Sequence, residues 1–310
     1  MVRLPLSDVA GKRFFVSTPL PALVMGIVNC TPDSFWQESR GSGHQAAELA
    51  LQLAEEGADI IDVGAESTRP GSNYIEEGEE LRRLIPVIEE IRRHSSIPLS
   101  VDTRKKVVME AAWQAGANIL NDISALEDDM ALGAFAAAQG ISVVLMHKRG
   151  IPATMQRTAS YGDAFSEVDT YLRHRVELAL SLGLHSDRIW IDPGIGFGKD
   201  FEANRGLVEQ CGRLCGGRYP VVMGLSRKTF VAQMIACQRV VTKTSGTGLS
   251  GSVSGEDLPA PHQRLAGTIE ANMIAVSKGA TVLRVHDVAA TRDMLSVYGS
   301  LKRECSVNSK

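Results

Sequence analysis

Residues 188–215 read RIWIDPGIGFGKDFEANRGLVEQCGRLC, which joins a short apolar run to an amphipathic stretch. The run, Arg188–Pro193, has the length of a buried strand and contains Asp192 near its end. The glycine-rich stretch that follows is typical of a tight turn, because glycine adopts backbone conformations that other residues avoid. The segment therefore predicts one strand, one turn and one helix in that order.

The same unit recurs along the chain. Short β-rich apolar runs lie at Leu23–Asn29, Asp59–Gly64, Pro98–Thr103, Asn118–Ile123, Ser142–His147, Arg188–Pro193, Tyr219–Ser226 and Thr281–His286. Amphipathic stretches lie at Gln45–Glu56, Ile75–His94, Lys105–Ala115, Met130–Gln139, Phe165–Leu182, Ala203–Cys215 and Ala289–Arg303. Alternating strands and helices predict parallel βαβ units of the α/β class. Eight units in 310 residues favour a closed (β/α)8 TIM barrel, with residues 1–310 as one domain. A doubly wound open sheet is the alternative.

Composition limits the partners that the chain could have. It has 33 basic and 36 acidic residues, so we expect it to bind neither nucleic acid nor a membrane. It has no apolar run long enough to span a bilayer and no leader-like N-terminus, which predicts a cytoplasmic protein. Its five cysteines lack zinc-site spacing and are expected to be reduced, with Cys211 and Cys215 on one helix face.

Two segments fall outside the repeat. Residues 1–20 form an N-terminal extension containing Phe14, Phe15 and Val16, and the sequence leaves open whether it closes the bottom of a barrel. Residues 242–262 are rich in Gly and Ser and are expected to be a flexible surface insertion rather than a functional lid. This insertion would separate a short helix starting near Lys228 from a longer helix at Arg264–Lys278.

Polar residues stand at the end of every predicted strand. In a (β/α)8 barrel these ends meet at the face where active sites are found. One polar residue in such a place is more often a cap or a turn former, the interpretation we favour for Asp33, Asp122 and Asp287 taken singly. Eight occupied ends are better explained by a shared site. The polar residues at these ends include Asn29, Glu66, Asp102, Asn121, His147, Asp192, Ser226, Arg227, Lys228, Arg284 and His286.

The residue types at these ends suit two chemistries. Carboxylates and amides such as Asp102, Asn121 and Asp192, together with Lys228, can match the donors and acceptors of a flat heterocycle, which Phe197 could cover. Cationic and polar groups suit a phosphate or diphosphate, and they are found at Asn29, Thr68, Arg69, Arg284 and His286. The glycine run near Asp192 has the spacing of neither a P-loop nor a complete dinucleotide fingerprint.

The chain resembles dihydropteroate synthase at eight stretches, in the order of that family. They are GIVNCTPDSF (26–35), DVGAESTRPGS (62–72), PLSVDTRK (98–105), GANILNDIS (116–124), VVLMHKRGIPATMQ (143–156), IWIDPGIGFGKDFEANRGLV (189–208), GLSRKTF (224–230) and RVHDV (284–288). The resemblance implies a (β/α)8 transferase of folate biosynthesis, usually a homodimer, and a target of sulfonamides. Its reaction would join a pterin diphosphate to p-aminobenzoate and release pyrophosphate.

The resemblance also implies residue roles. The pterin would be bound by Asp102, Asn121, Asp192 and Lys228; the diphosphate by Asn29, Arg284 and His286, with Mg²⁺ near Asn29; and p-aminobenzoate by Phe35, Thr68, Pro70, Lys228 and Thr229. The catalytic residues would be Asp102, Asp192, Lys228, Arg284 and His286. The loops around residues 30–40 and 66–73 would close over the site. Diphosphate would leave first, in an SN1-like step, and the aromatic amine would then attack.

The chain departs from the family's usual pattern in four places. Trp36-Gln37-Glu38-Ser39 replaces the usual Ser-Asp-Gly-Gly, Cys30 replaces an aliphatic residue, Ala65 replaces a glycine, and the Gly/Ser insertion at 242–262 is atypical. The altered first loop motivates one alternative, a pterin-binding paralog with little catalysis. A folate-dependent methyltransferase that acts with a corrinoid partner is the other. That group has no use for Ser226-Arg227-Lys228 or Arg284-Val285-His286, so these motifs favour the synthase.

Overall fold

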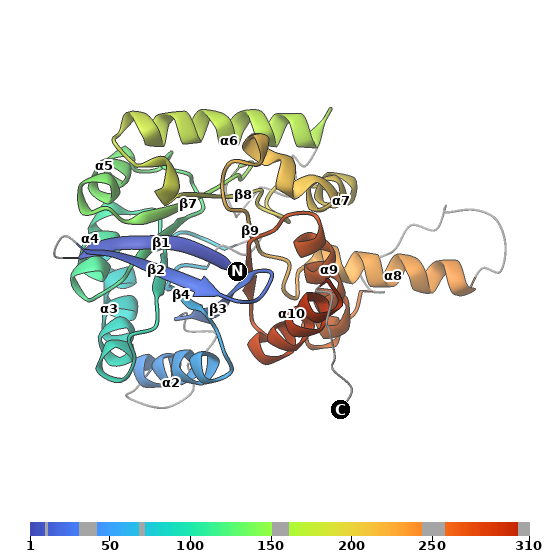
Figure 1. The fold of residues 1–310 in the computed structure, drawn as a ribbon, viewed down its shortest axis with the longest axis horizontal. Helices are drawn as coiled ribbons and strands as arrows, with labels where there is room; N and C mark the ends of the chain where they lie inside the picture. Colours follow the sequence, from blue (N-terminus) through green and yellow to red (C-terminus); the bar gives the residue numbers. More distant parts are fainter. Residues whose placement is uncertain (10–11, 31–41, 68–71, 151–160, 244–257, 303–310) are drawn as a thin grey trace, which may run out of the picture.

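Eight parallel strands form a closed barrel in the computed structural model, which describes residues 1–9, 12–30, 42–67, 72–150, 161–243 and 258–302 (Figure 1). The strand order is β8-β7-β6-β5-β4-β3-β10-β9, and a parallel bridge between Ile191 and Val221 joins its two ends. The TIM barrel is therefore confirmed and the open sheet is excluded. The strands are β3 (Leu23–Asn29), β4 (Ile60–Gly64), β5 (Leu99–Asp102), β6 (Ile119–Asp122), β7 (Ser142–Met146), β8 (Ile189–Asp192), β9 (Val222–Met223) and β10 (Val282–Val285).

Helices cover the outside of the barrel (Figure 1). They are α2 (Ser42–Glu55), α3 (Glu77–His94), α4 (Lys106–Gln114), α5 (Met130–Gln139), α6 (Ala164–Ser181), α7 (Phe201–Gln210), α8 (Thr229–Lys243), α9 (Leu265–Ser277) and α10 (Val288–Lys302). No helix within these described ranges is long and apolar enough to cross a membrane.

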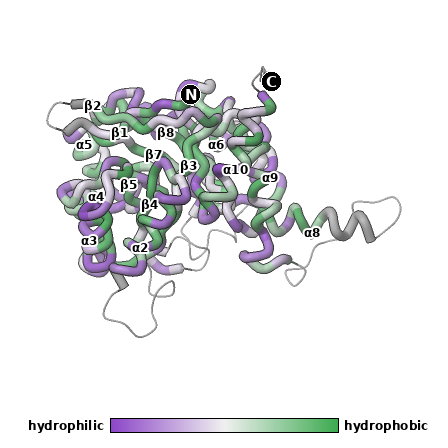
Figure 2. Tube along the Cα trace, turned by 60° about the horizontal axis from the view of Figure 1, so that its bottom comes forward, coloured by the Kyte–Doolittle hydropathy of each residue, from purple (hydrophilic) through white to green (hydrophobic). Residues whose placement is uncertain are grey.

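Two helix predictions were wrong. The helix near Lys228 is not short, because α8 has 15 residues against 13 in α9, and it projects from the body in both views (Figures 1 and 2). Residues 242 and 243 thus belong to α8, and residues 244–257 of the predicted insertion lie outside the described residues. Cys211 and Cys215 do not share a helix face, because α7 ends at Gln210 and Cys215 has a positive φ of 49°.

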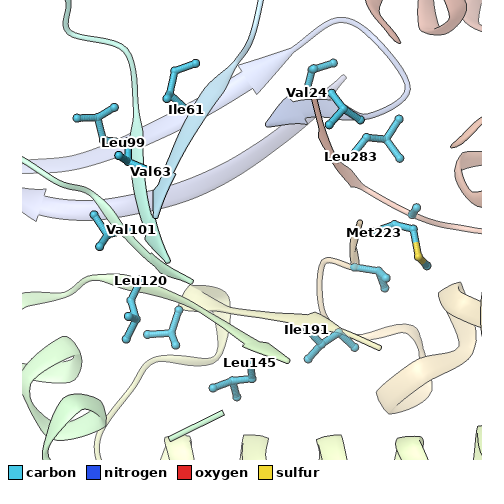
Figure 3. Packing of buried hydrophobic residues seen from close by; sticks show 14 of the residues in the cluster. Val24, Ile61, Val63, Leu99, Val101, Leu120, Leu145, Ile191, Met223 and Leu283 are labelled. Carbon is cyan, nitrogen blue, oxygen red and sulfur yellow. The ribbon is translucent and has the colours of Figure 1, made fainter. Parts of the chain in front are cut away.

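Period-two alternation divides the strand residues between two layers. One set packs between the strands and the helices (Figure 3): Val24, Ile61, Val63, Leu99, Val101, Leu120, Leu145, Ile191, Met223 and Leu283. The other set fills the barrel interior: Leu23, Met25, Ile60, Ile119, Val144, Trp190, Val222 and Val282. In Figure 2 strands β3 and β4 are largely green, whereas helix α3 on the outside mixes purple and green. The interior set is apolar up to the level where the polar strand ends begin.

The N-terminal extension closes the bottom of the barrel. It forms an antiparallel hairpin of β1 (Val2–Val9) and β2 (Lys12–Thr18). Leu4, Leu6 and Val16 join the interior apolar cluster, and Ser142 Oγ donates to the Pro5 carbonyl over 2.7 Å. Phe14 and Phe15, by contrast, are exposed, so the hairpin closes the barrel with its smaller aliphatic residues. The opposite end, where the polar strand ends converge, is left for the site.

Candidate active site

Strand register brings the predicted polar residues to one level. Asp102 on β5 pairs with Asn121 on β6 and with Gly64 on β4, and Gly64 pairs in turn with Asn29 on β3. Asp102 and Asn121 are buried at this level, and Asp192 is buried at the end of β8. These side chains follow the inward positions of their strands, so the sequence prediction that strand ends share one site is supported by their placement.

Arg284 connects this level to a carboxylate that the sequence reasoning missed. Its Nε donates to Asp62 Oδ2 over 2.6 Å, and its Nη2 donates to Asp102 Oδ2 over 3.1 Å. Asn121 Nδ2 also donates to Asp62 Oδ2, over 3.2 Å. Asp62 lies in the middle of β4 and is fully buried. The signal that could have revealed it is a charged residue inside an apolar strand, since such a residue is rarely buried without a partner.

Burial and ion pairing shift the pKa values of this cluster in opposite directions. Burial raises the pKa of Asp102 to about 8, although Arg284 partly offsets the effect. Burial also raises the pKa of Asp192, and Lys228 partly offsets that effect. Burial alone would lower the pKa of Arg284, but Asp62 and Asp102 together raise it. Arg284 is therefore a permanent cation beside Asp102, a carboxyl group that holds its proton more tightly than usual.

Lys228 and Phe197 lie in direct contact. Lys228 precedes α8, and its Nζ lies 4.7 Å from the centroid of the Phe197 ring and donates to the Ile195 carbonyl. Burial lowers the pKa of Lys228 to about 8, with Asp192 partly offsetting the effect. A side chain that is an ammonium below about pH 8 and lies beside an aromatic ring suits a flat ligand that presents a carbonyl acceptor.

The glycine-rich turn after β8 has little room for any other residue. Gly194 has φ +68°, and a Cβ added there would lie 1.8 Å from the His147 carbonyl oxygen. Asp192 Oδ1 accepts from Gly194 N over 2.6 Å, so the turn also orients a predicted ligand-binding carboxylate. The interpretation of this segment as a tight turn, and not as a nucleotide loop, is consistent with this geometry.

Lys199 holds the turn from below and was also missed. Its buried ammonium contacts His147 Nδ1 over 2.8 Å and donates to the carbonyls of Gly194 (2.9 Å) and Phe197 (3.1 Å). Burial, and next the charge of Lys199, lower the pKa of His147 to about 2, so His147 is a neutral acceptor. His147, predicted only as a polar strand end, thus braces the turn.

The last two strand ends are tied to each other. Ser226 Oγ lies 3.0 Å from His286 Nδ1 and accepts from His286 N over 3.2 Å, which orients the imidazole. Arg227, which has φ +56°, donates through Nε to Asp287 over 3.0 Å. Asp287 is therefore an ion-pair partner. Asp122, in contrast, accepts from Ser124 N and Leu126 N, and so is the turn former that we favoured.

The remaining predicted residues fall at the rim. Asn29 ends β3 and is partly exposed, and Thr229 begins α8 and is exposed. Glu66 is buried at the base of the second loop and pairs with Lys105 over 3.0 Å and with Arg104 over 2.9 Å. Burial raises the pKa of the Cys30 thiol to about 12, so it is no nucleophile. The predictions at Phe35, Trp36–Ser39, Thr68, Arg69 and Pro70 lie outside the described residues.

Comparisons with known proteins lead to one family. Residues 25–286 match the family described as "Pterin binding enzyme". The dihydropteroate synthase of Haemophilus influenzae is 38% identical over 276 residues, which cover 89% of this chain and 92% of that protein.

Solved structures extend the similarity to the fold. The Xanthomonas albilineans dihydropteroate synthase with 4-aminobenzoic acid has a TM-score of 0.80 and 40% identity, covering 96% of this chain and 98% of that one. The same enzyme in complex with 7,8-dihydropteroate has a TM-score of 0.78 and 38% identity, with the same coverage. The Yersinia pestis dihydropteroate synthase with a sulfonamide drug has a TM-score of 0.80 and 32% identity, covering 96% and 99%.

Proposed function

The chain belongs to the dihydropteroate synthase family of pterin-binding enzymes, and from this premise we propose how its residues divide the reaction. It is a transferase of folate biosynthesis that condenses 6-hydroxymethyl-7,8-dihydropterin diphosphate with p-aminobenzoate, giving 7,8-dihydropteroate and pyrophosphate. The relatives reported above are all synthases, which favours this activity over a weak paralog or a methyltransferase. The observation that carries the assignment of roles is the row of Asp102, Asn121 and Asp192 facing Arg284 and Lys228.

The pterin ring would be held by the buried row at the strand ends. Asp102 and Asp192 would accept N–H groups of the ring, Asn121 would supply a donor and an acceptor, and Lys228 would donate to a ring carbonyl. The two carboxylates lie where positive charge develops on the ring as the C–O bond lengthens. Their attraction is stronger in that transition state than in the ground state, and this difference accelerates the reaction.

The diphosphate would be held by Asn29, Arg284 and His286. Asn29 suits Mg²⁺ because the ion takes oxygen ligands, often one or two from the protein and the rest from phosphate and water. The described residues contain no cluster of three His, Cys, Asp or Glu side chains, so a cage made of protein ligands alone is not found among them. When bound, Mg²⁺ would neutralise charge on the diphosphate oxygens. Arg284 would offer the departing group a paired fork of N–H donors.

For the attack by the amine, the protein mainly has to hold p-aminobenzoate in position. Once diphosphate has left, the p-aminobenzoate nitrogen would attack the methylene carbon and then lose its proton. Phe197 and Lys228 border this region, and we propose that Phe35, Thr68, Arg69, Pro70 and Thr229 complete it, as the resemblance implies. Sulfonamides would compete for the same region, as a relative's structure with such a drug suggests.

We also propose a cytoplasmic homodimer. The free thiols of Cys30, Cys211 and Cys215 are buried, which suits a reducing compartment. Sedimentation equilibrium of the purified chain tests the dimer, and a species of 33.4 kDa would contradict it.

Pyrophosphate release by the purified protein tests the activity. The pterin diphosphate is supplied with Mg²⁺, with and without p-aminobenzoate, and a parallel reaction contains excess chelator. We expect release that depends on both the metal and the amine. Binding of the pterin diphosphate without amine-dependent release would contradict the synthase and support the paralog. Release that is unaffected by the chelator would contradict the Mg²⁺ assignment alone.

A further inference from the structure

Asp62 stands out because it is fully buried, charged and assigned no role by the reaction. All of its hydrogen bonds within the described part of the chain converge on Oδ2, which accepts from Arg284 Nε and Asn121 Nδ2. Its Oδ1 is buried and has no partner there. A buried carboxylate is costly unless paired, so Asp62 depends on Arg284. Arg284 is in turn fixed at its Nε atom by this contact.

The two carboxylates that hold Arg284 differ in depth. Asp62 pairs across the sheet with Ser100, whereas Asp102 pairs with Gly64, two residues closer to the C-terminal ends of the strands. Asp62 has no exposed surface, while the side chain of Asp102 is 10% exposed and that of Arg284 is 22% exposed. The Nε end of Arg284 is therefore sealed inside the barrel, and its Nη2 end lies at the level that a ligand reaches.

Gly64 makes room for the outer contact. A Cβ on Gly64 would lie 3.2 Å from Asp102 Cβ and 3.7 Å from Asp102 Oδ2, which is the oxygen that accepts from Arg284. The Asp102 carboxylate can thus approach Arg284 without moving its strand. The same carboxylate is expected to accept N–H groups from the pterin ring, so the ring and Arg284 compete for it.

We propose that Asp62 is a positioning residue that anchors Arg284 through Nε, so that Arg284 can exchange its Nη2 contact from Asp102 to the diphosphate when the pterin ring occupies Asp102. This inference rests on the proposed function, because it assigns the ring to Asp102 and the diphosphate to Arg284. The exchange at Asp102 has a consequence that the two assignments by themselves do not have. The ring and the diphosphate must bind cooperatively, even as separate molecules.

Cooperativity is measured with 6-hydroxymethylpterin and inorganic pyrophosphate as probes. The Kd of pyrophosphate is determined by calorimetry in the presence of Mg²⁺, with and without saturating 6-hydroxymethylpterin. In the unchanged enzyme we expect pyrophosphate to bind about tenfold more tightly when the pterin is present, a coupling of ordinary size between ligand sites. Asp62→Asn should abolish most of this coupling, because Arg284 then keeps Asp102 as its only carboxylate.

A matched control lies directly before the same strand. Asp59 also pairs with an arginine, Arg292, over 3.3 Å, but on the helix side of the barrel. Asp59→Asn should leave the coupling unchanged. Wild-type coupling in Asp62→Asn, or equal loss in both variants, would overturn the proposal.

A second variant keeps the test decisive if Asp62→Asn does not fold. In Asp102→Asn, Arg284 has already lost its outer carboxylate, so pyrophosphate alone should bind as tightly as it binds the wild type with pterin present. Weaker or unchanged pyrophosphate binding in Asp102→Asn would contradict the exchange. Turnover of the wild type is measured beside these titrations: a wild type without turnover contradicts the proposed function, whereas an active wild type without coupling contradicts this inference only.

Discussion

Replacing Arg284 by alanine should reduce stability as well as turnover. Asp62 has a side chain without exposed surface, and Arg284 is the cation that pairs with it. Removing one partner of a buried ion pair typically costs about 3–5 kcal/mol, because an uncompensated charge is left behind. We expect the free energy of unfolding to fall by about that amount at pH 8. Asp102 adds less, since its side chain keeps 10% of its surface exposed whereas that of Asp62 keeps none.

The loss should shrink as the pH falls. The pKa of Asp102 is already raised to about 8 by burial, with Arg284 partly offsetting the rise. A carboxyl group whose pKa is higher in the folded than in the unfolded state takes up a proton on folding, so it favours the folded state as pH falls through its folded pKa. Without Arg284 that pKa rises further. The difference between Arg284→Ala and wild type should therefore be larger at pH 8 than at about pH 5.5.

Urea unfolding followed by circular dichroism measures this effect in four proteins: wild type, Arg284→Ala, Asp62→Asn and the double variant. Asparagine at position 62 leaves no buried charge to compensate, so the double variant should be more stable than Arg284→Ala by at least about 2 kcal/mol. A loss below about 1 kcal/mol in Arg284→Ala at pH 8 would refute the reasoning. So would a double variant that is no more stable than Arg284→Ala.

Three further predictions concern the pterin side and the turn after β8. Affinity for the pterin ring should be greatest near pH 8, because below that pH Asp102 is protonated and above it Lys228 is neutral. Lys228→Arg should remove the decrease in affinity at alkaline pH. Calorimetry measures the affinity, with the titration of the free pterin determined separately, and an alkaline decrease that persists in Lys228→Arg would contradict the role of Lys228. Lys199→Met should raise the KM for the pterin diphosphate by about tenfold, the energy of one charged hydrogen bond, with a smaller change in kcat; steady-state kinetics with an unchanged KM would contradict the bracing role. Gly194→Ala should cost about 3 kcal/mol or more of stability because its Cβ would meet the His147 carbonyl, whereas Gly206→Ala, whose Cβ would meet nothing within 4 Å, should not; equal unfolding midpoints for the two variants would contradict this.

The barrel was predictable because its signals are local. Each strand is a short apolar run that ends in a polar residue, and each helix has its own amphipathic period, so the order of elements could be read without any contact between distant residues. The ends of elements were less well predicted. α7 ends at Gln210, and the chain continues as a 3-10 turn at Cys211–Gly217 that leaves helical geometry at Leu214 and Cys215. The glycines at 216 and 217, both with positive φ, are the signal that the predicted helix to Cys215 passed over.

The site was predictable where a residue stands at a strand end, and not where its partner comes from another strand. Asp102, Asn121 and Asp192 could be assigned because their position in the repeat is itself informative. Lys199 could not be assigned, because its partner His147 follows a different strand and its other partners are the backbone carbonyls of Gly194 and Phe197, which no side-chain pattern in the sequence marks.

Asp62 marks the level at which the side chains inside the barrel change from apolar to polar. Two residues before it, Ile60 faces the apolar interior, and two residues after it Gly64 opens the space beside Asp102. A carboxylate at that depth would be excluded by its desolvation energy unless a cation reached down to it, and Arg284 is long enough to do so from β10. Without Asp62, Arg284 would pair with Asp102 alone and would then oppose the binding of the pterin ring to Asp102. Asp62 is therefore stable at that depth only because Arg284 pairs with it, and Arg284 is available to the diphosphate only because Asp62 holds it at Nε.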